Sequence, residues 1–311
     1  MIDRSQTDFA QAPLVLASRV SQLALAQTQQ VRRALGDIPS EVLGLSTTGD
    51  EVLDRPLVEV GGKGVFIKTL EAALLDGRAD AAVHSLKDME TLLAPGTKIA
   101  AVLPREDRSD ALVGPYKSLD ELPDGAHIGT ASVRRAALLR HYRPDLNIGL
   151  LRGNVNSRIA RLDAGEFDAI ILAVAGLNRL QLDCPFTRLD ETIMPAAAAQ
   201  GAIGVQIAVG EDRAEAVQAA LAALNCAKTS DCVTAERAVL AALDGSCRTP
   251  ISAMADIDGS GRLSVKTAVL SADGQQKFSA EADGRRDEAA AIGTALGEQL
   301  LRECGGRAFL A

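Results

Sequence analysis

Residues 128–140 read IGTASVRRAALLR, and this stretch gives the clearest local indication of the fold. Residues 127–129 predict a short strand, and residues 132–141 predict a helix that ends before Pro144. A strand that passes through a tight turn into a helix is the repeating unit of an α/β protein. The stretch therefore predicts an α/β fold whose sheet is largely parallel or mixed and is covered by helices on both sides.

The same alternation of short apolar runs and helical patterns extends on both sides of this stretch. Strands are predicted at residues 14–17, 41–45, 79–84, 99–103, 147–151, 168–174 and 201–209, and helices at residues 21–35, 63–75 and 155–163. The last part of the chain differs, with helices predicted at 234–243 and 287–303 and strands at 251–257, 263–270 and 277–281. Asp-Gly and Gly-Ser-Gly turns separate these strands, which indicates a small α+β domain.

A chain of 311 residues is too long for one ordinary core, so two or three domains are expected. We predict a first α/β domain over residues 13–104 with a return segment at 201–224, and a second, arginine-rich α/β domain over residues 105–200. An α+β domain over residues 225–311 completes the chain. Residues 104–110 are the expected hinge between the first two domains.

The composition argues against several classes of protein. The net charge is -8, aromatic residues make up 3% and Trp is absent, whereas nucleic-acid-binding proteins usually have a basic face and aromatic platforms. The first residues have no sustained apolar run and no stretch approaches the length of a membrane span, so we expect neither a signal peptide nor membrane contact. Five cysteines without a CxxC pair favour a reduced, cytoplasmic protein, and no metal site is expected.

Arginine is concentrated in the predicted second domain. The stretch 134–161 has one acidic residue, Asp145, and contains Arg134, Arg135, Arg140, Arg143, Arg152, Arg158 and Arg161. Thr130 or Ser132 can cap the helix that carries the first two arginines, and Asn154 can cap the next helix. Guanidinium groups bind carboxylates in bidentate fashion, so these two helix starts suggest a ligand with several acidic groups. The alternative is a pair of arginines on a solvent-exposed helix face.

Two further segments have the pattern of a binding site. The segment VHSLKDM at 83–89 ends a buried strand in Ser85, Lys87 and Asp88, and α/β folds keep their sites at the carboxyl ends of strands. Lys87 and Asp88 are equally compatible with a solvated ion pair. The segment GGKG at 61–64 opens a predicted helix, where glycines let the backbone approach an anion and Lys63 adds a charge. A simple glycine-rich turn explains GGKG equally well.

Cys247 stands in the segment LDGSCRTPI at 243–251, in a Gly-Ser loop between a predicted helix and a predicted strand. A cysteine in a loop is accessible, so a reactive thiol is one interpretation and an unreactive thiol is the other. The residue types alone favour the unreactive thiol.

Taken together, these segments resemble the porphobilinogen deaminase family, also called hydroxymethylbilane synthases, from about residue 14 to the C-terminus. The resemblance is carried by LASRVSQLAL at 16–25, STTGD at 46–50, VGGKGVFIKTLE at 60–71, AVHSLKDM at 82–89, REDRSDAL at 105–112, GTASVRR at 129–135, LRGNVNSR at 151–158, AIILAVAGLNRL at 169–180 and GSCRTPI at 245–251. Each segment alone could arise by chance, but all of them in this order are highly specific. The expected architecture is two α/β domains like those of periplasmic binding proteins around a hinge, plus the small C-terminal α+β domain.

The resemblance also implies a transferase that condenses four porphobilinogen molecules head to tail with loss of ammonia, and then releases the linear tetrapyrrole hydroxymethylbilane by hydrolysis. Condensation starts on a covalent dipyrromethane cofactor, joined by a thioether to the loop cysteine, here Cys247. The matching Asp88 would be the catalytic acid group. The basic residues that would hold acetate and propionate groups are Arg19, Lys87, Arg134, Arg135, Arg152, Arg158 and Arg179. Ser21, Ser85, Thr130 and Ser132 would add hydrogen bonds, and Lys63 would contribute from a loop. The resemblance further implies a monomer.

The chain departs from the family pattern at three places. Met89 and Glu90 replace a hydrophobic residue followed by proline, residues 195–202 read PAAAAQGA in place of a PAVGQGA-like segment, and Gln206 stands where Glu is common. These differences leave open the local backbone of the crossover between the first two domains.

A solute-binding protein is the main alternative from another class, because it would have the same two α/β domains around a hinge. The missing signal sequence and the additional C-terminal domain count against it. A nucleic-acid-binding regulator ranks third, because of the net charge of -8 and the scarcity of aromatic residues.

Overall fold

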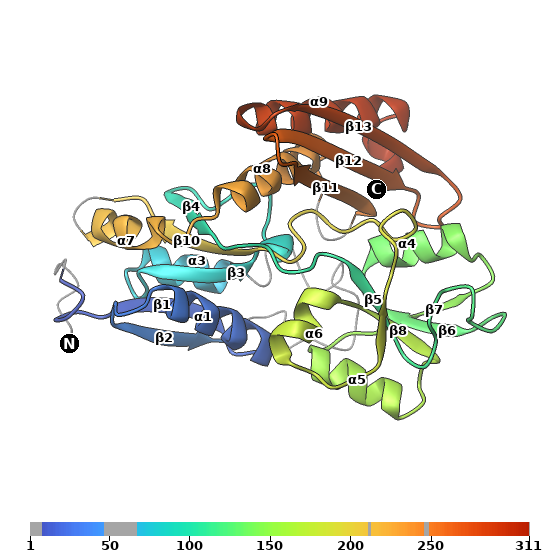
Figure 1. The fold of residues 1–311 in the computed structure, drawn as a ribbon, viewed down its shortest axis with the longest axis horizontal. Coiled ribbons are helices and arrows are strands. Elements are labelled where there is room, and N and C mark those ends of the chain that lie inside the picture. The colour runs from blue at the N-terminus through green and yellow to red at the C-terminus, as the bar shows by residue number, and fades with distance from the viewer. Residues whose placement is uncertain (1–7, 47–66, 211–212, 246–248, 311) are drawn as a thin grey trace. The chain divides into compact units, whose positions relative to one another are not determined.

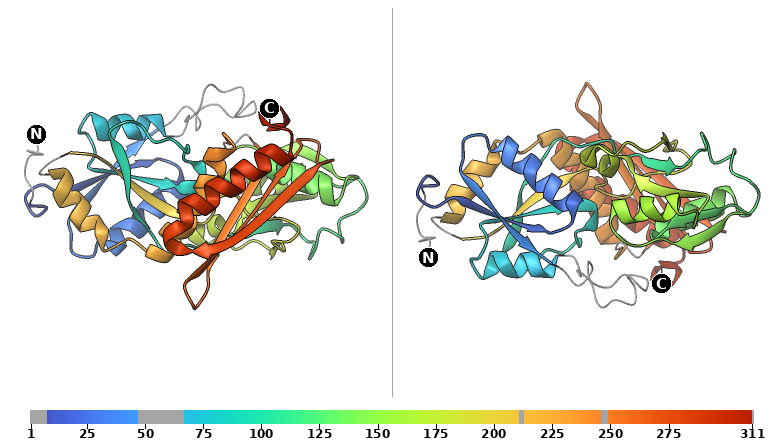
Figure 2. Two further views of the ribbon diagram at one scale, coloured as in Figure 1. Left: turned by 90° about the horizontal axis from the view of Figure 1, so that it is seen from above. Right: turned by 90° about the horizontal axis from the view of Figure 1, so that it is seen from below.

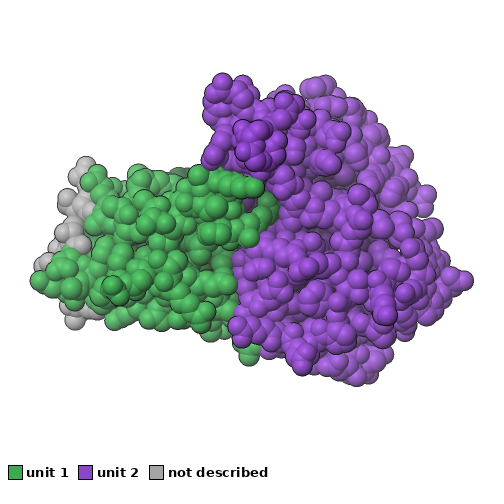
Figure 3. Space-filling model, viewed as in Figure 1, with its two compact units in different colours: residues 1–105, 202–230 green, residues 106–201, 231–311 purple. Residues whose placement is uncertain are grey.

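The computed structural model describes residues 8–46, 67–210, 213–245 and 249–310. The chain forms two compact units, the first from residues 1–105 and 202–230 and the second from residues 106–201 and 231–311 (Figure 3). Two of the predicted site residues, Lys63 and Cys247, lie outside the described residues. The second unit groups residues of the predicted second and third domains in one body, and the three-domain division stays a prediction.

The first unit is built on a five-stranded sheet with the strand order β2-β1-β3-β10-β4 (Figure 1). Its strands are β1 (Leu14–Arg19), β2 (Ser40–Leu45), β3 (Ala81–Ser85), β4 (Thr97–Val102) and β10 (Ile203–Ala208). β1 pairs in parallel with β2 and β3, whereas β10 is antiparallel to both β3 and β4. The predicted return segment therefore supplies the strand that joins β4 to the rest of the sheet.

The described residues of this unit contain the helices α1 (Gln22–Ala34), α3 (Lys68–Leu75) and α7 (Arg213–Ala222), and the one-turn helix η1 (Leu86–Asp88) follows β3. The sheet is buried on both faces, because alternate residues of β1 enter two different cores. Leu14 and Leu16 pack in a core with Val31, whereas Val15 and Ala17 pack in another. The continuous apolar sequence of β1 is thus explained by burial on both sides.

The second unit contains two sheets, of which the first has the strand order β7-β6-β8-β5-β9. Its strands are β5 (Asp110–Val113), β6 (His127–Thr130), β7 (Asn147–Leu150), β8 (Ala169–Ala173) and β9 (Phe186–Arg188). Helices α4 (Val133–Tyr142), α5 (Val155–Asp163) and α6 (Val174–Leu180) follow β6, β7 and β8 in turn. β6 is parallel to β7 and β8, and β5 is antiparallel to β8 and β9, so this sheet is also mixed.

The second sheet of this unit is antiparallel, with the order β11-β12-β13. Its strands are β11 (Ile251–Ile257), β12 (Arg262–Leu270) and β13 (Lys277–Arg285). Helix α9 (Ala289–Glu303) lies along one face of this sheet (Figure 2), where Leu296 and Leu300 pack with Val265. Helix α8 (Ala227–Ala242) adds Val239 to the same core, and the one-turn helices η2 (Arg286–Glu288) and η3 (Arg307–Leu310) flank α9.

The predicted α/β fold class is confirmed, with a smaller α+β part at the C-terminus. Two helices differ from the prediction at their N-terminal ends. The helix predicted at 63–75 is described from Lys68, and the helix predicted at 234–243 begins earlier, at Ala227. Among the described elements, the strands β5 and β9, the helices α6 and α7 and the one-turn helices η1 and η3 have no counterpart in the prediction. β5 and β9 have only four and three residues, too few for a periodic pattern, and α6 continues the apolar run of β8 without a polar turn.

Candidate active site

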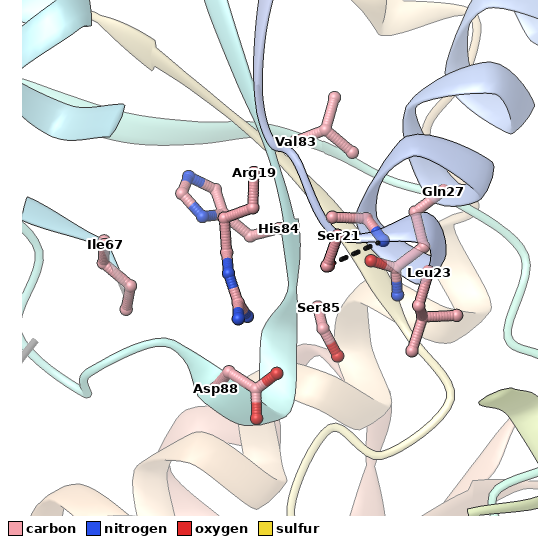
Figure 4. A pocket seen from close by; sticks show the side chains of 10 residues that line it. Arg19, Ser21, Leu23, Gln27, Ile67, Val83, His84, Ser85 and Asp88 are labelled. Carbon is pink, nitrogen blue, oxygen red and sulfur yellow. Dashed lines mark hydrogen bonds between the residues drawn. The ribbon is translucent and has the colours of Figure 1, made fainter. Parts of the chain in front are cut away.

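A small pocket in the first unit lies at the carboxyl ends of β1 and β3. It has a volume of about 50 Å³ and is lined by Arg19, Ser21, Leu23, Ala24, Gln27, Ile67, Val83, His84, Ser85 and Asp88. Figure 4 shows the Arg19 guanidinium pointing toward the side of the pocket where Ser85 and Asp88 lie. The pocket therefore combines a guanidinium, hydroxyl groups and a carboxylate in one place.

Local structure explains why these side chains meet. β1 and β3 are neighbouring parallel strands, so their last residues, Arg19 and Ser85, lie at the same edge of the sheet. Ser21 caps α1 by accepting a hydrogen bond from the N–H of Ala24 (3.4 Å). The turn of η1, fixed by the buried Leu86, then brings Asp88 to the pocket. Lys87 is half-buried in the same turn, but it is not one of the lining residues.

Four predicted site residues, Arg19, Ser21, Ser85 and Asp88, are thus brought together by the first unit. The pattern of polar residues after a buried strand pointed to this edge of the sheet, where Ser85 and Asp88 line the pocket, and their role in a site stays a prediction. Gln27, on the first turns of α1, was not among the predicted site residues, and it is buried at the pocket wall. Its signal in the sequence is weak, because a single glutamine on a helix is usually a surface residue.

The second unit contains a cluster of buried charges centred on Asp110, the first residue of β5. Arg134 Nη2 donates a hydrogen bond to Asp110 Oδ2 (2.7 Å), and Arg135 donates from Nη2 (2.7 Å) and Nε (3.1 Å) to Asp110 Oδ1. Gln200 Nε2 also donates to Asp110 Oδ1 (2.8 Å). Asp110 is completely buried, and Arg134 and Arg135 are 3% and 5% exposed. We call these four residues the arginine cluster.

This burial corrects one expectation from the sequence. The alternative of two arginines on a solvent-exposed helix face is wrong, because the first turn of α4 directs Arg134 and Arg135 into the interior. Sequence reasoning missed Asp110 and Gln200, which lie far from the arginines along the chain. A usable signal for Asp110 was present: it is an acidic residue that begins a short, otherwise apolar strand, where a buried carboxylate needs a cationic partner.

The arginine cluster has more positive than negative charge, since two guanidinium groups share one carboxylate. Burial alone would raise the pKa of Asp110, but the two guanidiniums outweigh burial and hold that pKa well below its usual value. Burial lowers the pKa of Arg134, against the attraction of Asp110. Arg134 Nε is buried and has no hydrogen-bond partner among the residues that the structure describes. The cluster thus has both the charge and a free donor for another anion.

The other predicted residues of this unit lie after strands and on helices: Thr130 ends β6, Ser132 caps α4, and Arg158 lies on α5. Thr130 Oγ1 accepts a hydrogen bond from Ser132 N (3.1 Å), and Ser132 Oγ accepts one from Arg135 N (3.4 Å). Each hydroxyl can still donate its own proton. Arg158 Nε donates to Gly153 O (2.8 Å).

Arg152 follows β7 and is 7% exposed, and Arg179 Nη2 donates to the carbonyl oxygen of Gly201 (2.7 Å). Burial lowers the pKa of Arg179, although the carboxylate of Glu106 acts in the opposite direction. The predicted arginines of the second unit are therefore mostly held by the interior of the protein rather than spread over its surface.

Within the described ranges, no group of three or more His, Cys, Asp and Glu side chains is arranged to hold a metal ion. Among the helices of the described residues, none is long and apolar enough to span a bilayer.

The family models and the curated relative indicate one family. Residues 14–216 match the family model described as "Porphobilinogen deaminase, dipyromethane cofactor binding domain", and residues 230–302 match "Porphobilinogen deaminase, C-terminal domain". A curated porphobilinogen deaminase of Ralstonia nicotianae is 48% identical over 304 residues, which cover 94% of this chain and 90% of that protein.

Solved structures give a weaker likeness. A periplasmic binding protein of an ABC transporter from Brucella ovis, with glutathione bound, has a TM-score of 0.41 and 15% identity, over 76% of this chain and 70% of that one. The VFT2 domain of Bordetella pertussis BvgS has a TM-score of 0.39 and 16% identity, over 71% of this chain and 91% of that one. These TM-scores are too low to support an argument. The two family models and the close relative decide the matter: the chain belongs to the porphobilinogen deaminase family.

Proposed function

We propose that this chain is the transferase hydroxymethylbilane synthase, which condenses four porphobilinogen molecules head to tail, with loss of ammonia, and releases hydroxymethylbilane by hydrolysis. Family membership supports the activity. The arginine cluster is the structural observation that carries the proposal. Each pyrrole ring of this substrate has an acetate and a propionate group, and a cluster in which two buried guanidiniums share one carboxylate suits such a ligand.

Asp88 is the proposed catalytic group. Its carboxylate lines the same pocket as Arg19 and Ser85. A carboxylate beside the pyrrole N–H can stabilise the positive charge that develops on the ring and can help to move protons. Arg19, with Ser21, Ser85 and the neighbouring Lys87, would hold the carboxylates of the incoming substrate. Lys63 is proposed as a further contributor from the sequence alone.

The residues of the second unit fit the family's dipyrromethane cofactor. The buried Arg134 Nε, without a partner among the described residues, and the excess positive charge of the arginine cluster both call for an additional carboxylate. Arg134, Arg135, Arg152, Arg158 and Arg179 are the proposed ligands of its carboxylates, and the hydroxyl protons of Thr130 and Ser132 are available to them. The bound cofactor supplies the pyrrole α-carbon to which the first new ring is joined. Cys247 is the proposed site of its thioether.

Three further features remain proposals, the first from the family and the other two from the sequence. They are a monomeric state, action in the cytoplasm, and a division into three domains with a hinge at residues 104–110.

The direct test is the intact mass of the purified protein, combined with peptide mapping across Cys247. We expect an adduct equal to two porphobilinogen units less two ammonia molecules, located on Cys247 and absent from Cys247→Ala. Cys226→Ala is the matched control and should keep the adduct, because Cys226 is a half-buried cysteine elsewhere in the chain. An unmodified protein that gains no adduct and forms no tetrapyrrole when porphobilinogen is added would contradict the proposed function. Reversible binding of porphobilinogen without product would then favour a solute-binding role.

A further inference from the structure

Arg108 connects three separate segments of the second unit through one guanidinium group. Nε and Nη2 donate to the two carboxylate oxygens of Glu191, each at 2.8 Å. Nη1 donates to Ala255 O (3.0 Å), and Nη2 also donates to Asp256 Oδ2 (2.7 Å), both on β11. The Arg108 side chain is only 15% exposed. A bidentate pair that is largely withdrawn from water fixes an orientation, which an exposed ion pair on a flexible side chain does not.

The backbone of Arg108 connects the same contacts to the arginine cluster. Gln200 Nε2 donates to Arg108 O (2.6 Å) and also to Asp110 Oδ1 (2.8 Å). Arg108 lies two residues before Asp110 on the same segment. A displacement of Arg108 would therefore move the carboxylate that orients Arg134 and Arg135.

A second route from Arg108 also ends at Arg134. Glu191 lies four residues before Pro195, whose carbonyl oxygen accepts hydrogen bonds from Arg134 Nη1 (2.5 Å) and from Ser252 Oγ of β11 (3.1 Å). The segment held by Arg108 is thus also the segment that joins β11 to Arg134. Both routes connect the sheet β11-β12-β13 with the arginine cluster.

We propose that Arg108 is a positioning residue, which holds the sheet β11-β12-β13 against the arginine cluster and so sets where a carboxylate-bearing pyrrole chain meets Arg134 and Arg135. The inference rests on the proposed function, and it assigns to Arg108 an effect on the reaction without contact with substrate. A lysine keeps the positive charge of Arg108 but not its planar, bidentate guanidinium. Arg108→Lys should therefore hold the arginine cluster in position only in part.

The test uses full-length wild type, R108M, R108K and E191Q. For each protein, apo-enzyme is prepared, and the rate at which it gains the dipyrromethane adduct from porphobilinogen is followed by intact mass. The kinetic constants kcat and KM of the holoenzyme are then measured. R188M is the matched control: Arg188 pairs with Asp107 (2.6 Å) in the same unit, but its side chain is 63% exposed.

We expect the rate of adduct formation and kcat to fall about tenfold or more in R108M, since small misplacements of reacting groups are costly. KM should change less than about twofold, because free substrate is not held by Arg108. For R108K and E191Q, the rate of adduct formation and kcat should lie between the values of wild type and R108M. For R188M, both should match wild type. If R108M does not fold, R108K and E191Q, which each keep part of the network, decide the question.

Wild-type rates in R108M, or in R108K and E191Q together, would overturn the inference. The inference would also be overturned if R188M were as impaired as R108M, or if R108M showed a raised KM with an unchanged kcat. Failure of the proposed function has a different signature: wild-type protein itself would gain no adduct and form no product, and both proposals would fall.

Discussion

The substitution Asp110→Asn tests the arginine cluster most directly. Asn has nearly the shape of Asp but no charge, so two buried guanidiniums would lose their only carboxylate in the cluster. Asp110 accepts three hydrogen bonds from Arg134 and Arg135 and one from Gln200, with distances from 2.7 to 3.1 Å. An Asn side chain also places an amide N–H₂ where an acceptor is needed.

The expected loss of stability follows from the burial of the ion pairs that Asp110 makes with Arg134 and Arg135. Removing one partner of a buried ion pair leaves an uncompensated charge and typically costs about 3–5 kcal/mol. The remaining carbonyl oxygen of Asn keeps one acceptor, so we expect the free energy of unfolding to fall by about 4 kcal/mol at pH 7. With an m-value of about 2–3 kcal/mol/M, the urea midpoint should fall by about 1.5 M.

Tyrosine fluorescence is a suitable assay. The chain has no Trp and two Tyr, and both Tyr116 and Tyr142 belong to the second unit, so the signal reports on the unit that holds the cluster. The control is Asp283→Asn, because Asp283 is 50% exposed and pairs with Arg262 at 3.3 Å. That variant should lose less than about 1 kcal/mol. A loss below about 1 kcal/mol in Asp110→Asn, or equal losses in the two variants, would refute the assigned role of the cluster.

The pH dependence gives an independent check of the same residue. The folded-state pKa of Asp110 lies below its unfolded value, so its stabilising contribution is fully present above the unfolded pKa of about 3.9 and is lost as pH falls toward the folded value. The stability difference between wild type and Asp110→Asn should therefore be constant from about pH 8 to 5 and shrink below about pH 4. A difference that grows on acidification would contradict the assigned direction.

Three other variants have clear expected outcomes. Asp88→Asn should keep the fold and lose nearly all turnover of porphobilinogen, as measured by tetrapyrrole formation, and near-normal turnover would remove Asp88 from the mechanism. Gly201→Ala should lower the free energy of unfolding by about 2 kcal/mol or more in a urea titration, because Gly201 has φ +84° and an added Cβ would overlap the carbonyl oxygen of Glu106. Unchanged stability would show that the backbone relaxes there. Glu236→Gln should cost about 2 kcal/mol in the same titration, because the buried carboxylate accepts one backbone N–H on each oxygen, at 2.7 and 2.8 Å, and an amide NH₂ cannot accept either; an unchanged free energy of unfolding would contradict this role of the carboxylate.

The place of Ser85 and Asp88 in the first pocket could be predicted from a local pattern, whereas Arg19 and Ser21 were expected only from the family resemblance. Neighbouring parallel strands end at the same edge of a sheet, so polar residues at the ends of two such strands lie near one another. Arg19 and Ser85 are 66 positions apart along the chain, yet each is the last residue of a buried strand. The alternation of strands and helices is also a local pattern, and it therefore predicted the fold class.

The arginine cluster could not be predicted in the same way, because it depends on tertiary pairing. The sequence shows that Arg134 and Arg135 begin a helix, but not which face of that helix packs against β5. β5 itself is only four residues long and has no recognisable period. Gln200 reaches Asp110 from a segment that resembles an alanine-rich loop in the sequence.

That alanine-rich segment also answers a question that the sequence left open. Ala199 adopts φ +58°, a left-handed conformation that L-residues rarely take, and its N–H donates to Glu236 at 2.7 Å. The crossover backbone is therefore held by a buried carboxylate on α8, a partner 37 positions away.

The late position of β10 has a consequence for the order in which the chain folds. Among the strands of the described residues, β4 has β10 as its only neighbour in the first sheet, and β10 begins at Ile203, about one hundred residues after β4 ends. All the strands of the sheet β7-β6-β8-β5-β9 have left the ribosome once Arg188 has emerged, while the N-terminal sheet still lacks a strand. We therefore expect the middle of this protein to fold before its beginning during synthesis, although domains usually fold in the order of synthesis. Until residue 208 emerges, the apolar edges of β3 and β4 remain available to chaperones.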